Sequence, residues 1–181
     1  MAEGTGRLGG QAIRRVVYTP EQIGAEVAAM GRRITEHYPP AEGLLVLGLL
    51  KGSFIFLADL VRHIDRPLHV DFLVAASYGA GMVSTGDVRL VYDPEATLAE
   101  RHVLLVEDII DSGHTINRLI PMLERRGARS LEVCTLLHKR IASGLVRDAR
   151  WVGFEAPAEF LVGYGLDHAE NFRHLPFIAS L

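Results

Sequence analysis

Three acidic residues and a glycine-containing turn form the stretch of the sequence with the clearest chemical potential. Glu107 and Asp108 follow an apolar run, Asp111 comes after two further apolar residues, and Ser-Gly-His-Thr at 112–115 opens a helical pattern. Glycine lets the backbone approach an anion, the hydroxyls donate hydrogen bonds, and a helix N-terminus favours a phosphate. Paired acids can hold sugar hydroxyls. These residues therefore predict a phosphosugar site, with the carboxylate of Asp111 left near the reacting atom.

Other interpretations of this stretch are weaker. Asp-Ser-Gly alone can be a turn with a helix cap, but here the preceding acids and the following Thr115 are also in place. The stretch is not a Walker motif, because no Gly-Lys-Ser/Thr follows a glycine-rich loop, and the sequence has no G-x-G-x-x-G dinucleotide fingerprint. The pattern at residues 107–115 therefore favours a phosphosugar site over a simple turn or a nucleotide-binding loop.

The surrounding pattern predicts the elements that would position these residues. Apolar runs bounded by turn residues alternate with helical spacing from residue 43 to 137, which is typical of βαβ units and a parallel sheet with helices on both faces. We expect strands at 43–49, 69–77, 88–92, 102–106 and 130–137, and helices at 20–37, 54–64 and 115–126. Thr19 with Gln22 forms a capping box, and Ser53 can cap the second helix.

Ligands of open parallel sheets bind beyond the carboxyl ends of the strands. Four expected strands end in polar residues there: Lys51-Gly52, Ser77-Tyr78, Glu107-Asp108 and Lys139. A glycine-rich loop is expected at 78–87. Short strands at 151–154 and 160–164 and a polar turn at 167–173 predict a small separate lobe near the C-terminus.

Composition excludes several classes of protein. The chain has 181 residues, of which 49% are hydrophobic and 23% charged, which is typical of one globular domain rather than a disordered chain. The net charge of −3 argues against a nucleic-acid-binding protein, and no apolar run is long enough for a membrane span. The lone Cys134 fits a reducing cytoplasm. Residues 1–10 are expected to be a flexible lead-in without a secretory signal.

Five stretches together resemble the type I phosphoribosyltransferases, and within them the hypoxanthine–guanine branch. Val106–Thr115 resembles the family's phosphoribosyl-pyrophosphate (PRPP) motif. The other stretches are similar to its pyrophosphate loop, catalytic flap, base-facing lysine and hood: Leu49–Gly52, Ala76–Gly79 with Ser84–Gly86, Leu136–Arg140, and Glu159–Asp167 followed by Phe172-Arg173. The resemblance covers residues 43–177. It implies a single α/β domain with a central, mostly parallel sheet flanked by helices. A core at about 40–150 would be covered by a hood from about 151–181 and part of the N-terminal segment.

The resemblance also implies a role for each matching residue. Glu107 and Asp108 would bind the ribose hydroxyls, and Asp111 would act as general acid/base near purine N7. The remaining roles are the 5′-phosphate (Asp111, Ser112, Gly113, His114, Thr115), pyrophosphate (Lys51, Gly52, Arg173), the flap (Ser77, Tyr78), the purine (Lys139, Phe160, Leu161, Asp167) and magnesium (Glu107, Asp108, Asp167). His114 stands where the pattern more often has Lys, Arg or Asn, so its backbone is expected to serve the phosphate. The Leu50–Lys51 peptide is expected to be cis.

The implied reaction is purine salvage, in which PRPP and hypoxanthine or guanine give IMP or GMP and pyrophosphate with Mg²⁺. A homodimer or homotetramer is implied, with neither a nucleic acid nor a membrane as partner. A xanthine preference remains open, because the added 2-oxo group would be read by backbone near Leu161. An adenine enzyme is disfavoured by Asp111 and Lys139. A PRPP-sensing regulator on the same fold remains the rival from another class, and the retained Asp111, Lys139 and Ser77-Tyr78 argue against it. The histidines outside the motif show no metal-ligand spacing, so no zinc is expected.

Overall fold

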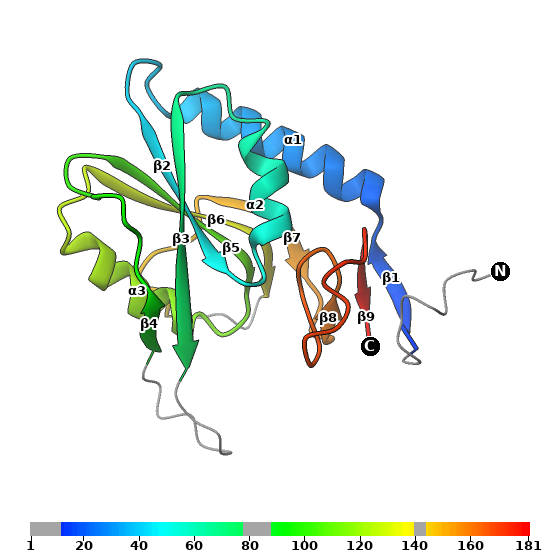
Figure 1. The fold of residues 1–181 in the computed structure, drawn as a ribbon. Coiled ribbons are helices and arrows are strands. Elements are labelled where there is room, and N and C mark those ends of the chain that lie inside the picture. Colours follow the sequence, from blue (N-terminus) through cyan, green and yellow to red (C-terminus); the bar gives the residue numbers. More distant parts are fainter. Residues whose placement is uncertain (1–11, 78–87, 140–143) are drawn as a thin grey trace.

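The computed structural model of the protein describes residues 12–77, 88–139 and 144–181, which form a six-stranded and a three-stranded sheet (Figure 1). In chain order the elements are β1 (Arg15–Tyr18), α1 (Pro20–His37), β2 (Leu44–Leu50), α2 (Phe54–Val61), β3 (Leu68–Ser77), β4 (Val88–Tyr92), β5 (His102–Ile110), α3 (His114–Glu124), β6 (Ser130–Lys139), β7 (Trp151–Ala156), β8 (Leu161–Val162) and β9 (Ile178–Ser180). The described helices include none that is long and apolar enough to cross a membrane.

The larger sheet has the order β4-β3-β2-β5-β6-β7, and all its pairings are parallel except β3 with β4. Alternate residues of β2 face opposite sides: Leu44 and Val46 pack in one core cluster with α1 and α2, and Leu45 and Leu47 pack in another with α3. The predicted parallel sheet with helices on both faces is therefore confirmed (Figure 1).

The start of α1 follows the local sequence. Gln22 N donates to Thr19 Oγ1 at 3.3 Å, and Thr19 N donates to Gln22 Oε1 at 2.9 Å, so the predicted capping box is present. Ser53 behaves differently from the prediction. Its hydroxyl donates to Leu49 O at 2.7 Å instead of capping α2, because the tight turn after β2 leaves that carbonyl within reach.

Strand β5 extends further than the sequence predicts. The acidic residues after Val106 suggest that the strand ends there, but β5 continues to Ile110, because its partner β6 supplies a paired residue at most of the added positions. Glu107 lies opposite Thr135 and Ile110 opposite His138. The paired acids therefore lie on a strand, and only Asp111 belongs to the following turn.

The smaller sheet joins the two ends of the chain. It has the antiparallel order β1-β9-β8, so the N-terminal strand pairs with the C-terminal one. We define the hood as β1 together with residues 157–181. The hood has a small core of its own, made by Val162, Phe172, Leu175 and Ala179. Strand β7 lies in the larger sheet, so the C-terminal part of the hood begins after β7 and not at about residue 151, as the sequence predicts.

Candidate active site

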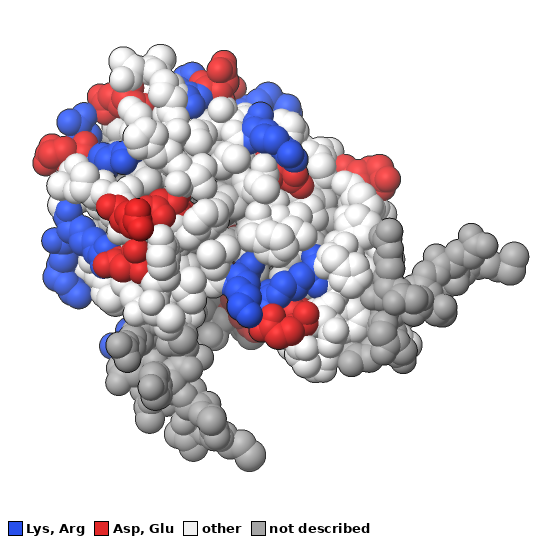
Figure 2. Space-filling model, in the orientation of Figure 1, with Lys and Arg blue, Asp and Glu red and all other residues white. Residues whose placement is uncertain are grey.

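Strands β2, β5 and β6 are neighbours in the larger sheet, and their carboxyl ends lie side by side, next to the hood (Figure 1). Lys51 follows β2, Asp111 follows β5, and Lys139 ends β6. Strand β3 ends there at Ser77, which pairs with Val88, whereas Tyr78 and the rest of the expected flap lie outside the described residues. Figure 2 shows positive and negative side chains interspersed over the visible face rather than gathered into one basic field.

The two acids at the end of β5 are costly to ionise in this environment. Glu107 is 9% exposed, and burial, together with the neighbouring Asp108 charge, raises the pKa of Glu107 well above its ordinary value. Burial also raises the pKa of Asp108 to about 6, although the Ile109 N–H bond and the Arg173 charge pull it down. Two carboxyls with raised pKa values at a strand end are typical of a functional site.

The phosphate turn, residues 111–115, forms a small hollow at the start of α3. The hollow has a volume of about 70 Å³ and is lined by residues 109–116 together with Glu107. Gly113 is the N-cap residue with φ +81°, and a Cβ there would lie 2.3 Å from Leu145 Cδ2. Ser112 Oγ and His114 Nδ1 are 2.9 Å apart, within hydrogen-bond distance. The His114 side chain thus contacts the Ser112 hydroxyl within the turn.

Asn117, one turn into α3, joins the helix to the segment at residues 144–146. Its Nδ2 donates to Gly144 O at 3.0 Å, and its Oδ1 accepts from Val146 N at 2.8 Å. Both bonds hold the segment that carries Leu145 against Gly113. The sequence interpretation missed Asn117, because an asparagine inside a helix has no visible partner until the distant segment is placed.

Asp111 and Lys139 meet although 28 residues separate them in the chain. The Lys139 ammonium donates to Asp111 Oδ2 at 3.2 Å. The lysine side chain is only 12% exposed, whereas that of Asp111 is 54% exposed. The fold therefore joins the predicted acid/base to the predicted base-facing cation and leaves the carboxylate open to a ligand.

Residues 49–52, called the pyrophosphate loop after their predicted role, are packed between β5 and the hood. The Leu50–Lys51 peptide bond is cis, as the resemblance implies. A Cβ on Gly52 would lie 1.7 Å from Asp108 Oδ2, so a larger residue there would displace the Asp108 carboxylate. On the other side, a Cβ on Gly165 would lie 2.1 Å from Gly52 O. The absence of a side chain at Gly52 and Gly165 thus lets this loop lie directly against the Asp108 carboxylate on one side and the backbone of the hood on the other.

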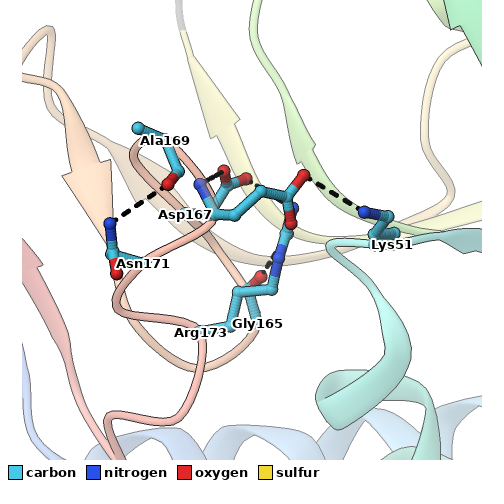
Figure 3. A network of polar contacts seen from close by, with 7 residues as sticks. Lys51, Gly165, Asp167, Ala169, Asn171 and Arg173 are labelled. Carbon is cyan, nitrogen blue, oxygen red and sulfur yellow. Dashed lines mark hydrogen bonds and ion pairs between the residues drawn. The ribbon is translucent and has the colours of Figure 1, made fainter.

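Four charged side chains connect the hood to this loop (Figure 3). Arg173 donates from Nη1 to Gly165 O at 2.8 Å, and its Nη2 lies 2.8 Å from Asp167 Oδ1. Glu170 accepts from Lys51 Nζ at 3.1 Å and lies 3.3 Å from Arg173 Nη2. Asp167, Arg173 and Lys51 were predicted from the resemblance. Glu170 was missed, although its spacing of three residues from both Asp167 and Arg173 was a usable signal.

Phe160 and Leu161 mark the part of the hood assigned to the purine. The Phe160 ring is 54% exposed and meets the edge of the His168 ring at a centroid distance of 5.3 Å. This exposure argues against Phe160 as an ordinary core residue and favours a ring that faces a ligand. Leu161 lies at the start of β8 and is buried.

The residues expected to hold magnesium are not gathered into one chelating group. Among the described residues, no group of three or more His, Cys, Asp or Glu is arranged to hold a metal ion. Asp167 is on the hood and paired with Arg173, whereas Glu107 and Asp108 are on β5. Carboxylates that are spread in this way fit Mg²⁺, which is commonly held by one or two carboxylates together with substrate phosphates. They do not fit an ion held by protein side chains alone.

Comparisons with known proteins agree with this arrangement. The family model described as phosphoribosyl transferase domain matches residues 17–169. The hypoxanthine phosphoribosyltransferase of Salmonella typhimurium is 45% identical over 167 residues, which cover 91% of this chain and 94% of the relative. The hypoxanthine-guanine phosphoribosyltransferase of Dictyostelium discoideum is 39% identical over 171 residues, with coverage of 93% and 95%.

Solved structures show the same likeness. The crystal structure of a hypoxanthine-guanine phosphoribosyltransferase from Bacillus anthracis, with a HEPES molecule in its active site, superposes with a TM-score of 0.88. It is 40% identical in sequence and covers 94% of this chain and 99% of its own. The fold predicted from the resemblance, a mostly parallel sheet flanked by helices and covered by a hood, is confirmed.

Proposed function

The chain belongs to the phosphoribosyl transferase family, and from this membership we propose that it transfers the 5-phosphoribosyl group of PRPP to hypoxanthine or guanine in purine salvage. Relatives named for this activity match more than nine-tenths of the chain. The observation that carries the proposal is the ion pair of Lys139 with Asp111, next to the phosphate turn and the buried acids of β5. A site for a phosphosugar and a site for a purine thus lie together at the carboxyl ends of the strands.

We propose that each part of the site holds one part of PRPP. The hollow at residues 111–115, at the N-terminal end of α3, receives the 5′-phosphate, where backbone N–H groups and hydroxyls can donate. Glu107 and Asp108 at the end of β5 accept hydrogen bonds from the ribose hydroxyls. The pyrophosphate loop and Arg173 face the pyrophosphate group.

In the proposed reaction the bond from ribose C1 to pyrophosphate breaks and a bond from C1 to purine N9 forms. The purine N7 proton passes to the Asp111 carboxylate, the nearby acceptor. The Lys139 ammonium faces purine O6 and also stands 3.2 Å from Asp111, so one cation orients both the base and the group that takes its proton. Phe160 stacks on the purine and, with the rest of the hood, excludes water from the activated ribose.

We infer that the reaction uses Mg²⁺. The buried acids of β5, whose pKa values burial raises, and Asp167 of the hood offer carboxylate oxygens on either side of the expected PRPP position. When bound, the ion offsets the negative charge of the leaving pyrophosphate. Since the described acids form no cage of their own, we propose that the ion enters with PRPP.

The test of the proposed function is turnover of PRPP and magnesium with hypoxanthine, guanine, xanthine and adenine. The Lys139 ammonium only donates, so it matches a 6-oxo acceptor and opposes the adenine amino group. Sites built around such a hydrogen bond reject the wrong partner by roughly 10⁴- to 10⁵-fold. We expect kcat/KM for adenine to be lower by about that factor. Xanthine turnover above that of hypoxanthine would show a xanthine-preferring enzyme, and PRPP binding without any turnover would show a regulator.

Lys139→Gln tests the assignment of the base-facing cation. Its kcat/KM for hypoxanthine and guanine should fall sharply, whereas its affinity for PRPP should change much less, because Lys139 lies at the end of β6 beside Asp111 and not in the phosphate hollow. The same ranking and rates as the wild type would contradict the assignment.

Removal of the metal tests the inferred cofactor. In excess EDTA, with repurified substrates, we expect turnover to stop and calorimetry to show weakened PRPP binding, because magnesium joins PRPP to the acids of the site. Readdition of Mg²⁺ should restore both. Full binding and turnover in EDTA would contradict the inference.

We further propose that the protein is a homodimer or homotetramer of the reducing cytoplasm. The assembly rests on the resemblance to the family, and the compartment rests on the lone, buried Cys134. Sedimentation equilibrium measures the first, and fractionation of cells that express the protein measures the second.

A further inference from the structure

Glu170 lies between two cations of the proposed pyrophosphate site: Lys51, whose backbone we assign to pyrophosphate, and Arg173, whose guanidinium would neutralise it. Its Oε1 is 3.1 Å from Lys51 Nζ, and its Oε2 is 3.3 Å from Arg173 Nη2. A glutamate carboxylate is ionised at neutral pH, so Glu170 places a full negative charge between these two cations. This one carboxylate therefore neutralises part of the positive charge that would otherwise be available to the pyrophosphate leaving group.

Glu170 is not needed to hold these residues in place. Arg173 is already fixed by Gly165 O and by Asp167, each at 2.8 Å. The side chain of Glu170 is 66% exposed and contributes nothing to the hood core. An exposed ion pair such as this contributes little to stability. The position of Glu170 between two cations of the site is thus better explained by its charge than by packing.

A pyrophosphate group in the proposed position would draw on the same positive charges that the Glu170 carboxylate holds in the empty site. Both offer anionic oxygens to the ammonium of Lys51 and the guanidinium of Arg173. When pyrophosphate is present, the glutamate must release these cations or remain as a like charge beside it. Either outcome weakens the binding of pyrophosphate. The effect is appreciable, because the interaction between charges only a few ångströms apart is strong.

We propose that Glu170 is an internal counter-anion, which occupies the pyrophosphate cations of the empty enzyme and competes with PRPP and pyrophosphate for them. The inference rests on the proposed function for the identity of these ligands. The competition lowers affinity for both and favours the departure of the pyrophosphate product. Glu170 thus affects the binding of these ligands through the charges of Lys51 and Arg173, and it does not take part in the chemical step.

Glu170→Gln tests the proposal, because it removes the charge and keeps the size and hydrogen-bonding reach of the side chain. We expect the KM for PRPP and the inhibition constant of magnesium pyrophosphate both to fall by about 3- to 10-fold. The KM for hypoxanthine should stay within about 2-fold, because the described hydrogen bonds of the Glu170 side chain go to Lys51 and Arg173. The bond from Glu170 to Asp167, which is assigned to the purine, is made by the backbone N–H of Glu170 and is kept in the variant. A purely structural role would not tighten binding of the anions selectively.

The matched control is Glu26→Gln, which removes a glutamate that pairs with Arg33 at 2.8 Å on α1, away from the site. Its constants should equal those of the wild type. An unchanged or raised KM for PRPP in Glu170→Gln would overturn the proposal, since it would mean that Glu170 has no effect or instead prepares the cations for the ligand.

Calorimetry with magnesium pyrophosphate separates this inference from the proposed function. The measurement needs no purine and no turnover. Tighter pyrophosphate binding by Glu170→Gln supports the counter-anion even if the base assignment fails in the turnover test. Equal binding by the variant and an active wild type would overturn the counter-anion and leave the proposed function intact.

Discussion

The floor and the hood of the site are built in opposite ways. The floor, residues 107–115, is one continuous segment that runs from β5 into α3. The hood takes its strands from both ends of the chain and reaches the site through a turn in which Gly165, Ala169 and Glu170 have positive φ values. The floor carries buried acids with raised pKa values, whereas the charges of the hood lie in exposed or half-exposed ion pairs.

This difference suggests a division of tasks. A continuous segment between a buried strand and a helix can hold catalytic groups rigidly. Burial makes the ionised carboxylates in this segment unfavourable, and a ligand that binds them can relieve this cost. A turn held by ion pairs and close backbone contacts can exchange its partners when a ligand arrives. We therefore expect substitutions in the floor to change mainly the chemical step, and substitutions in the hood to change mainly the affinity for ligands.

The largest effect is expected from Asp111→Asn in the floor. The variant keeps the shape of the side chain but cannot take the purine N7 proton, so kcat should fall by about 10²- to 10⁴-fold. KM for PRPP should change far less. Steady-state kinetics with hypoxanthine measures both, with the exposed Asp148→Asn as control. Near wild-type turnover would mean that Asp111 is not the proton acceptor.

A smaller effect is expected from Gly165→Ala in the hood, with Gly163→Ala as its matched control. Both glycines have φ near +100°, and in both an added Cβ would lie 2.1 Å from a carbonyl oxygen. That oxygen belongs to Gly52 of the pyrophosphate loop for Gly165, and to Phe177 inside the hood for Gly163.

Both variants should therefore lose similar stability, because the backbone strain is alike. Only Gly165→Ala should displace the pyrophosphate loop, and we expect its KM for PRPP to rise by about 10- to 100-fold, an effect of the order produced by small displacements in a site. Thermal unfolding and PRPP kinetics measure the two quantities. Equal KM values for the two variants would refute the contact between hood and loop as the cause.

The smallest effect is expected on stability, from Glu107→Gln. The folded-state pKa of Glu107 lies well above its ordinary value because of burial. The folded protein therefore holds this proton after the unfolded chain has lost it, and stability falls as the pH rises above the unfolded pKa. Glu107→Gln has no carboxyl group at this position, so its stability does not decrease with pH for this reason.

We expect Glu107→Gln to match the wild type at about pH 4 and to be more stable than the wild type at pH 7.5 in the absence of ligands. Urea unfolding at both pH values measures the difference, and the exposed Glu95→Gln serves as control. A variant less stable than the wild type at pH 7.5 would contradict the idea that burial of the acid is unfavourable in the empty enzyme.

The sequence by itself determined the α/β class, the parallel sheet and most elements of its core. These features follow from local patterns: apolar runs bounded by turns, the Thr19 capping box of α1, and glycine and hydroxyl residues before α3. The contiguous floor motif was visible for the same reason, because its acids and phosphate turn are neighbours in the chain. Lys51 and Lys139 were visible as polar residues at the ends of expected strands, but the resemblance supplied their roles. It also supplied Asp167 and Arg173, which the pattern alone places only in a polar turn.

The tertiary structure decided what those residues meet. The continuation of β5 through Glu107 depends on its pairing with β6, and the strands β1 and β9 are too short to be recognised before the chain ends are brought together. The Lys139 contact with Asp111, the Glu170 bridge between Lys51 and Arg173, and the contact of Gly165 with Gly52 join segments from different elements. Such contacts arise from packing between distant segments, and no local pattern of residues encodes the distance between them.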